Sequence, residues 1–145
     1  MTAEKILKQI GDIGLMPVLR ASSVAEAMAI ADAIVAGGVT VLEVTMTVPG
    51  AIKVIEKLAD QYGDKLLIGS GTVLDPETAR ATLLAGAKFV VSPALNVKTI
   101  ELCRGYSAPI IPGVLTPTEV VTAWQAGADI VKVFPCSAVG GASYL

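Results

Sequence analysis

Two charged residues stand in stretches that are otherwise apolar, and their types could support chemistry on a carbonyl group. Lys132 lies within Ile130–Phe134 (IVKVF), and Glu43 lies within Val39–Thr45 (VTVLEVT). Burial disfavours the ammonium form of a lysine, and the neutral amine is a nucleophile towards carbonyl carbons. A neighbouring carboxyl group could then move protons. Such a pair could form a Schiff base with a 2-oxo acid and break a C–C bond without a metal.

Each of these residues also has a purely structural interpretation. Lys132 could extend its ammonium to solvent or pair with an acid, and Glu43 could form a buried ion pair with Lys132 or Arg20. Arg20 could grip a carboxylate with two hydrogen bonds or form a salt bridge at the rim. Phe134 could wall a small substrate or fill the interior. The turn Gly69–Thr72 offers close backbone approach and a hydroxyl, or it is an ordinary turn.

The composition indicates one globular domain over residues 1–145. Apolar residues make up 53% of the chain and charged residues 17%, so a large core is expected. The net charge of −2 predicts no nucleic-acid partner. We expect no membrane span and no signal peptide. Cys103 and Cys136 form no disulfide framework, which favours the cytoplasm.

The chain contains no histidine. This removes the commonest general base and the commonest transition-metal ligand. The two cysteines have no metal-binding spacing, and we interpret both as inert. We therefore expect no metal and no cofactor, and any catalysis must come from lysine, acidic, hydroxyl or backbone groups.

Strands and helices alternate along the chain, which is typical of βαβ units with a parallel sheet. A short amphipathic helix, Ala3–Ile10, comes first. Asp75 and Asn96 are expected helix caps, and glycines end several helices. The predicted strands are Leu15–Leu19, Val39–Thr45, Leu66–Ile68, Phe89–Val91, Pro109–Ile111 and Ile130–Phe134, and the predicted helices between them are Val24–Val35, Ala51–Gln61, Pro76–Leu84, 96–103 and Pro117–Ala126.

Two folds fit these units, an open doubly wound sheet and an incomplete (β/α)8 barrel of about six βα units. The polar residues help to choose between them. Arg20, Glu43 and Lys132 fall at or near the C-terminal halves of the first, second and sixth strands. A barrel brings all such strand ends to one face, whereas an open sheet gathers its site at a single switch point. The distribution therefore favours the barrel.

Several motifs, in order and closely spaced, resemble those of the class I 2-keto-3-deoxy-6-phosphogluconate (KDPG) aldolases, many of which also act as 4-hydroxy-2-oxoglutarate aldolases. The resemblance runs from about Leu15 to the last residue. The motifs together are specific, although each alone is weak. They are VLR at 18–20, LEVTMTVP at 42–49, IGSGTV at 68–73, VSP at 91–93, PGVLTPTE at 112–119 and KVFP at 132–135.

The resemblance implies a TIM barrel, usually a homotrimer, and an aldehyde-lyase that cleaves a 2-keto-3-deoxy sugar acid phosphate to pyruvate and glyceraldehyde 3-phosphate. It implies that Lys132 forms the Schiff base and that Glu43 is the general acid/base. The expected substrate-binding residues are Arg20 and Thr72 at the pyruvyl carboxylate, with Pro93 and Phe134 lining the pocket. Thr47 stands where some relatives carry a second arginine, so that role is not carried over.

The resemblance also implies that relatives continue for two further βα units, whose glycine-rich loops bind the substrate phosphate. We therefore expect the chain to be an aldolase fragment that ends after the sixth strand. Two hypotheses follow. The first is an active aldolase acting on a small 2-keto acid. The alternative is a catalytically incompetent structural fragment or complementing piece of such an enzyme.

Overall fold

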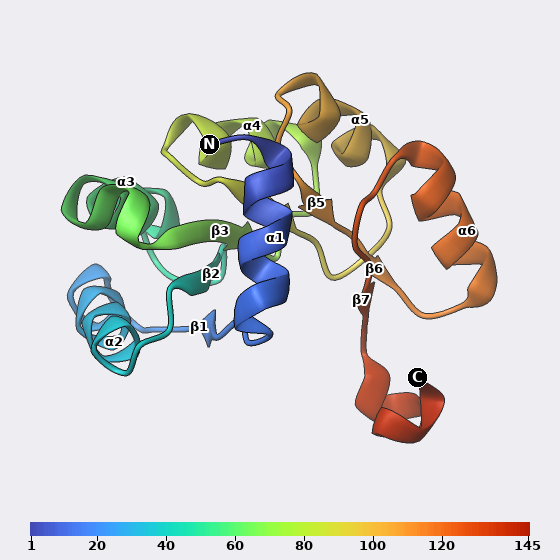
Figure 1. Ribbon diagram of the computed structural model, residues 1–145, viewed down its shortest axis with the longest axis horizontal. Helices are drawn as coiled ribbons and strands as arrows, with labels where there is room; N and C mark the ends of the chain where they lie inside the picture. The colour runs from blue at the N-terminus through green and yellow to red at the C-terminus, as the bar shows by residue number, and fades with distance from the viewer.

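In a computed structural model of residues 1–145, the strands of each of two sheets lie side by side in chain order and parallel to one another (Figure 1). The order never reverses, so the doubly wound sheet is excluded and the incomplete barrel is confirmed. One residue, Pro112, separates β5 from β6. The strands are β1 (Val18–Leu19), β2 (Val41–Thr45), β3 (Leu67–Gly71), β4 (Phe89–Val91) and β5 (Ile110–Ile111) in a five-stranded sheet, and β6 (Gly113–Val114) and β7 (Lys132–Val133) in a pair.

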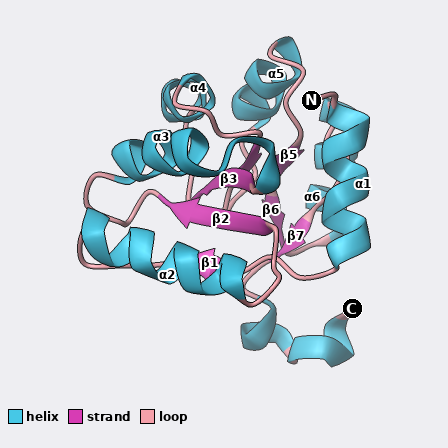
Figure 2. Cartoon of the chain, turned by 60° about the vertical axis from the view of Figure 1, so that its left-hand side comes forward, coloured by secondary structure: helices cyan, strands magenta, loops and turns pink.

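Helices α2 to α6 surround the sheet, and α1 crosses the front of the view in Figure 1 (Figures 1 and 2). None of the helices combines the length and apolar character that a membrane crossing requires. The helices are α1 (Ala3–Ile13), α2 (Val24–Ala36), α3 (Ala51–Tyr62), α4 (Pro76–Leu84), α5 (Val97–Gly105) and α6 (Pro117–Ala126), and the 3₁₀ helices are η1 (Gly63–Lys65), η2 (Cys136–Val139) and η3 (Gly141–Tyr144).

Capping side chains define the helix starts that the sequence predicted best. The Asp75 carboxylate accepts a hydrogen bond of 2.6 Å from the backbone N–H of Thr78, and Pro76 occupies the first turn of α4. Thr116 and Glu119 form a reciprocal capping box at the start of α6. Because these contacts satisfy backbone donors that the helix leaves free, the predicted bounds of α4 and α6 are confirmed.

Helix α1 is three residues longer than the predicted Ala3–Ile10 because it continues through Gly11 and ends at Gly14. Gly14 adopts a left-handed conformation (φ 65°) and its N–H bonds to the carbonyl of Ile10. Gly11 lies within the last turn and has no neighbour that a side chain would meet. A glycine in the left-handed region is the usual helix end, so the chain turns where that conformation is adopted.

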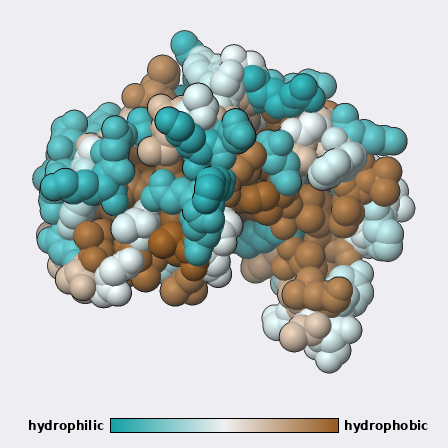
Figure 3. Space-filling view, in the orientation of Figure 1, coloured by the Kyte–Doolittle hydropathy of each residue, from teal (hydrophilic) through white to brown (hydrophobic).

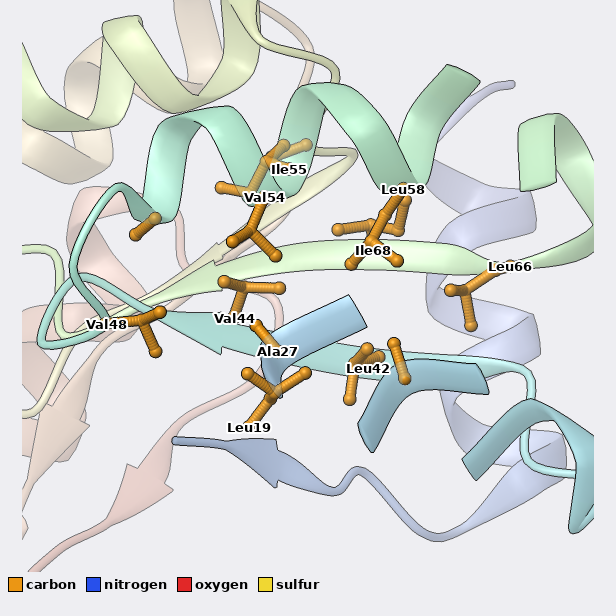
Figure 4. Close-up of a cluster of buried hydrophobic side chains, with 13 residues drawn as sticks. Leu19, Ala27, Leu42, Val44, Val48, Val54, Ile55, Leu58, Leu66 and Ile68 are labelled. Carbon is orange, nitrogen blue, oxygen red and sulfur yellow. The ribbon is translucent and has the colours of Figure 1, made fainter. Parts of the chain in front are cut away.

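The outer face of the sheet packs against the helices. Leu42 and Val44 of β2 and Ile68 of β3 point towards α2 and α3, where Leu58 is fully buried (Figure 4). A second cluster joins β4, β5 and β6 to α5 and α6. Side chains alternate along a strand, so the residues between these face the concave side.

The concave face is closed by α1 at the N-terminal ends of the strands. Ile6 of α1 packs with Val41, Leu67 and Phe89, each at or near the start of its strand. Glu43 lies two residues beyond Val41, and Lys132 lies two residues beyond Ile130, which packs against the same cluster, so both face the concave side further along the chain. The polar residues of the concave face are therefore left at the C-terminal ends, opposite α1.

Five of the six predicted strands differ from the observed bounds, and two of the differences involve proline. Strand β3 extends to Gly71, three residues beyond the predicted end at Ile68, so the interpretation of this segment as a turn is wrong up to Gly71. Pro17 lacks a donor, so β1 contains only Val18–Leu19, and Pro112 interrupts the ladder between β5 and β6. Gly113, expected in a loop, pairs with Lys132. The predicted strand Ile130–Phe134 forms β7 over two residues only.

Strand β7 is also less buried than predicted. It pairs with β6 alone, and both of its residues are partly exposed. Apolar surface lies exposed beside it, over α6 and towards the C-terminal end (Figure 3). A groove of about 330 Å³ runs there, lined by Val114, Leu115, Thr116, Pro117, Val120, Val133, Tyr144 and Leu145.

The two faces of α3 give a test of this packing. Leu58→Ala removes a fully buried side chain and should lower the free energy of unfolding by about 2–5 kcal/mol. Ile52→Ala on the same helix, where the side chain is 40% exposed, should change it by much less. Urea denaturation measures both. Equal losses would mean that α3 does not bury the face described.

Candidate active site

Glu43 is a buried carboxyl group on the concave face. It lies in the middle of β2, its residue is 1% exposed, and its backbone N–H donates to the carbonyl of Pro17 at 3.0 Å. No side chain or backbone group of the protein donates a hydrogen bond to its carboxylate. The group is therefore almost entirely withdrawn from water, and only nearby charges and a small remaining solvent contact compensate, which is costly for the ionised form.

Burial raises the pKa of Glu43 above its ordinary value of 4.5. The nearby positive charges of Lys132 and Arg20 act in the opposite direction and lower this pKa, but desolvation is the larger effect. A carboxyl group whose pKa is shifted upwards holds its proton closer to neutral pH. It can therefore both donate and accept a proton more readily than a surface glutamate.

Lys132 supplies the ammonium closest to this carboxyl group. The distance from its Nζ to Glu43 Oε2 is 3.9 Å, which makes an ion pair but exceeds hydrogen-bonding length. The Lys132 side chain is 29% exposed, so the amine keeps contact with solvent. The reason is the position of β7, which has a strand neighbour on one side only. The pairing of Glu43 with Lys132, one of the alternatives left open by the sequence, is present.

Phe134 contributes an aromatic face to the same group. The Lys132 Nζ lies 5.1 Å from the centroid of the Phe134 ring, within the range of a cation–π interaction. The ring follows β7 on the concave side and is 43% exposed. It is thus an exposed wall beside the amine and not part of the packed interior.

The other three predicted residues follow the C-terminal ends of their strands. Arg20 comes directly after β1, is exposed, and is close enough for its charge to act on Glu43. Thr72 follows β3 and adopts a left-handed conformation (φ 58°), rare for a β-branched residue and a mark of a constrained position. Pro93 follows β4, and its carbonyl lies against Gly113 beside Lys132.

Thr45 continues the inner row of β2 after Glu43, although it is not among the site residues predicted from the sequence. Its hydroxyl is buried and donates to the carbonyl of Leu19 at 3.0 Å. It also lies 2.8 Å from the hydroxyl of Thr47. The hydrogen bond from Thr45 to Leu19 joins the end of β1 to β2. It thereby fixes the backbone next to Arg20 relative to Glu43. The sequence contained a signal for this residue, because Thr45 lies two positions after Glu43 and so faces the same side of the strand.

Neither a cavity nor a metal cluster marks this group of residues. The largest surface pocket, about 450 Å³, lies at the opposite end of the strands between the turns before β5 and β7. None of the protein's three pockets is lined by Lys132 or Glu43. No three acidic or cysteine side chains lie together in a way that could hold a metal ion. The paired charges, and not a cavity, single out this site.

Comparison with known proteins gives the family of this barrel. The model of the KDPG and KHG aldolase family matches residues 5–145. The chain belongs to this family. The 2-dehydro-3-deoxy-phosphogluconate aldolase of Treponema pallidum is 35% identical over 140 residues, which are 97% of this chain and 66% of that relative.

Solved structures agree with the fold. The KDPG aldolase of Zymomonas mobilis, determined with 3-phosphoglycerate, superposes with a TM-score of 0.88 at 32% identity, over 98% of this chain and 67% of that one. The Legionella pneumophila KDPG aldolase, with pyruvate captured as a covalent carbinolamine, gives 0.82 at 36% identity, over 88% and 61%. The chain thus spans about two thirds of the length of these relatives.

The raised pKa of Glu43 predicts a pH dependence of stability. When the pH rises above the ordinary carboxyl value of 4.5, the unfolded state loses this proton before the folded state does. The contribution of Glu43 to the free energy of unfolding therefore falls as the pH rises towards the folded pKa. Glu43→Gln does not ionise and should gain stability relative to the wild type over this range, as measured by urea denaturation.

An exposed glutamate on α5 provides the control. Glu101→Gln should leave the pH profile of unfolding unchanged from that of the wild type. A stability difference between Glu43→Gln and the wild type that does not vary with pH would contradict the burial of an ionisable group at position 43.

Proposed function

We propose that the protein is a Schiff-base aldolase that cleaves 2-keto-3-deoxy-6-phosphogluconate to pyruvate and glyceraldehyde 3-phosphate. It could also cleave 4-hydroxy-2-oxoglutarate to pyruvate and glyoxylate, since the family includes both specificities. The observation that carries the proposal is the pair formed by Lys132 and Glu43, 3.9 Å apart at the C-terminal end of a family barrel.

Lys132 begins the reaction. Its neutral amine attacks the C2 carbonyl carbon of the keto acid, and loss of water from the carbinolamine leaves an iminium ion. The C3–C4 bond then breaks, and its electron pair moves into the iminium to give an enamine. The proton of the C4 hydroxyl is transferred to a base, and the aldehyde leaves. Protonation of the enamine at C3 and hydrolysis of the imine release pyruvate and restore the amine.

Glu43 moves both protons in this proposal. Its carboxylate oxygen lies 3.9 Å from the nitrogen that would carry the substrate, so C3, two bonds from that nitrogen, falls within its reach. The C4 hydroxyl oxygen is four bonds from the nitrogen, and a water bound between this hydroxyl and Glu43 passes its proton to the carboxylate. As a carboxylate it accepts the proton of the C4 hydroxyl, and as the acid it returns a proton to C3. The raised pKa supports this double role because both forms are then accessible nearer neutral pH.

The remaining residues bind the substrate in this proposal. The guanidinium of Arg20 and the hydroxyl of Thr72 take the pyruvyl carboxylate, since both follow strand ends beside Glu43. Phe134 covers the apolar methylene carbon, and Pro93 bounds the space next to Lys132. Their common place at the C-terminal ends of the strands supports this assignment.

The proposal extends to the setting of the enzyme. Residues 1–145 form a single, incomplete aldolase barrel domain in the cytoplasm, and the resemblance to the aldolases implies a homotrimer for the full-length family. The cysteines support the compartment, since Cys103 and Cys136 are both free. Sedimentation equilibrium measures the oligomeric state directly.

A second candidate function is a scaffold that does not assemble an active site. The exposure of Lys132 and of Phe134, at 29% for the side chain of the lysine and 43% for Phe134, favours it, because water then has access to the amine that would have to react. This alternative makes the chain a structural or complementing piece of an aldolase. It differs from the first in one respect, the reactivity of Lys132.

Reduction with borohydride in the presence of pyruvate tests the proposal. Hydride converts the imine to a stable secondary amine, so the intact mass should increase by one reduced pyruvyl group and peptide mapping should place it on Lys132. Lys132→Ala should lose the adduct completely. Lys88→Ala removes a lysine at the opposite end of the strands and should keep it.

An adduct on several lysines alike, or one that survives in Lys132→Ala, would refute the assignment of the nucleophile. A folded wild-type protein without any adduct would make the scaffold the correct function. Circular dichroism of each variant establishes that it is folded.

A further inference from the structure

The inner row of β3 carries two glycines, Gly69 and Gly71, where the neighbouring strands carry side chains. Neither lies in the left-handed region of the backbone, so neither is required by conformation. The position in this segment that does adopt a positive φ is the next one, and it holds a threonine, Thr72. The reason for glycine at these two positions must therefore be steric: other atoms occupy the space where a side chain would lie.

The space beside Gly71 is filled by the carboxyl end of Glu43. A Cβ at position 71 would lie 2.5 Å from Cγ of Glu43 and closer still to its Cδ and Oε1, whereas ordinary contacts begin at 3.4 Å. At Gly69 the neighbour is different: a Cβ there would meet the ring of Phe89, with Cδ2 at 2.6 Å. The two glycines accommodate two different side chains.

The backbones on both sides of this contact are fixed. Gly71 pairs with Thr45, and its carbonyl accepts a hydrogen bond of 2.8 Å from the N–H of Met46. Glu43 pairs with Gly69 on one side and Val18 on the other. A side chain at position 71 would clash with Glu43. Because both strands are held by their pairing, the Glu43 side chain would move to relieve the clash, and the strands would not.

We propose that Gly71 is a positioning residue for Glu43, whose carboxylate reaches Lys132 because position 71 carries no side chain. The catalytic consequence rests on the proposed function, while the placement of the carboxylate does not. A methyl group at 71 displaces the carboxylate from its present position 3.9 Å from Lys132 Nζ. A displacement of about 1 Å in a reacting group can cost about 100-fold in rate.

Gly71→Ala and Gly69→Ala form a matched pair for the test. Each adds one methyl group to the inner face of β3, but only the first meets Glu43. Gly71→Ala should reduce proton exchange at C3 of pyruvate, followed by NMR in D2O, about 100-fold. Gly69→Ala should reduce it only in proportion to its loss of folded protein, which urea denaturation measures.

Truncating Glu43 provides the rescue of folding. Glu43→Ala removes Cγ, Cδ and Oε1, the three atoms that a methyl group at position 71 would meet, so it should restore part of the stability lost in Gly71→Ala, as measured by urea denaturation. Glu43→Ala should not rescue Gly69→Ala, whose methyl group meets the ring of Phe89 instead. If Gly71→Ala does not fold, recovery of folding in the double variant is the decisive result. Additive losses in the double variant would overturn the proposal.

A readout without turnover separates this inference from the proposed function. The 13C-labelled carboxyl group of Glu43, assigned by its absence in Glu43→Gln, can be titrated by NMR in each variant. Gly71→Ala should change its titration midpoint, and Gly69→Ala should retain the wild-type value. An unchanged midpoint in folded Gly71→Ala would refute the positioning role. A wild-type protein that does not exchange the protons of pyruvate would refute the proposed function. The NMR titration of Glu43 would still test the positioning role of Gly71.

Discussion

The ion pair between Glu43 and Lys132 is the interaction on which the rest of the site depends, and the parallel sheet makes it possible. The two residues are far apart in the sequence, on the second and last strands. The consecutive parallel ladders place both on the concave face, and α1 closes the other end of that face with apolar side chains. A carboxyl group buried to 1% exposure without a hydrogen-bond donor needs a nearby cation, and β7 delivers one. In the proposed function, this ion pair holds the proton-transfer group, Glu43, beside the nucleophile, Lys132.

Much of this arrangement could be predicted from the sequence because its causes are local. Side-chain alternation fixes the face on which each strand residue lies, so the common orientation of Glu43 and Lys132 follows from apolar runs with one charge in each. Capping residues fixed the bounds of α4 and α6, since Asp75 and Thr116 act on N–H groups within three residues. The motifs that resemble the aldolases supplied the roles, and the family match over residues 5–145 confirms the resemblance itself.

The features that could not be predicted depend on neighbours distant in the sequence. Pro112 separates two strands where one was expected, because Gly113 finds its partner in Lys132 on the next unit. The partial exposure of β7 results from its having one strand neighbour, which an apolar run such as IVKVF does not reveal. The space required at Gly71 is set by a side chain on another strand, and the sequence presents only a glycine that any turn could contain.

Exchange of the methyl protons of pyruvate with D2O, followed by proton NMR, tests the central claim most directly, because it requires both members of the pair. Lys132 must form the imine that acidifies C3, and Glu43 must remove and return the proton. The account predicts exchange by the wild type, no exchange above the uncatalysed rate by Lys132→Ala, and strongly reduced exchange by Glu43→Gln with the imine still trapped by borohydride. Exchange that persists in Lys132→Ala, or that is unaffected in Glu43→Gln, would contradict the account.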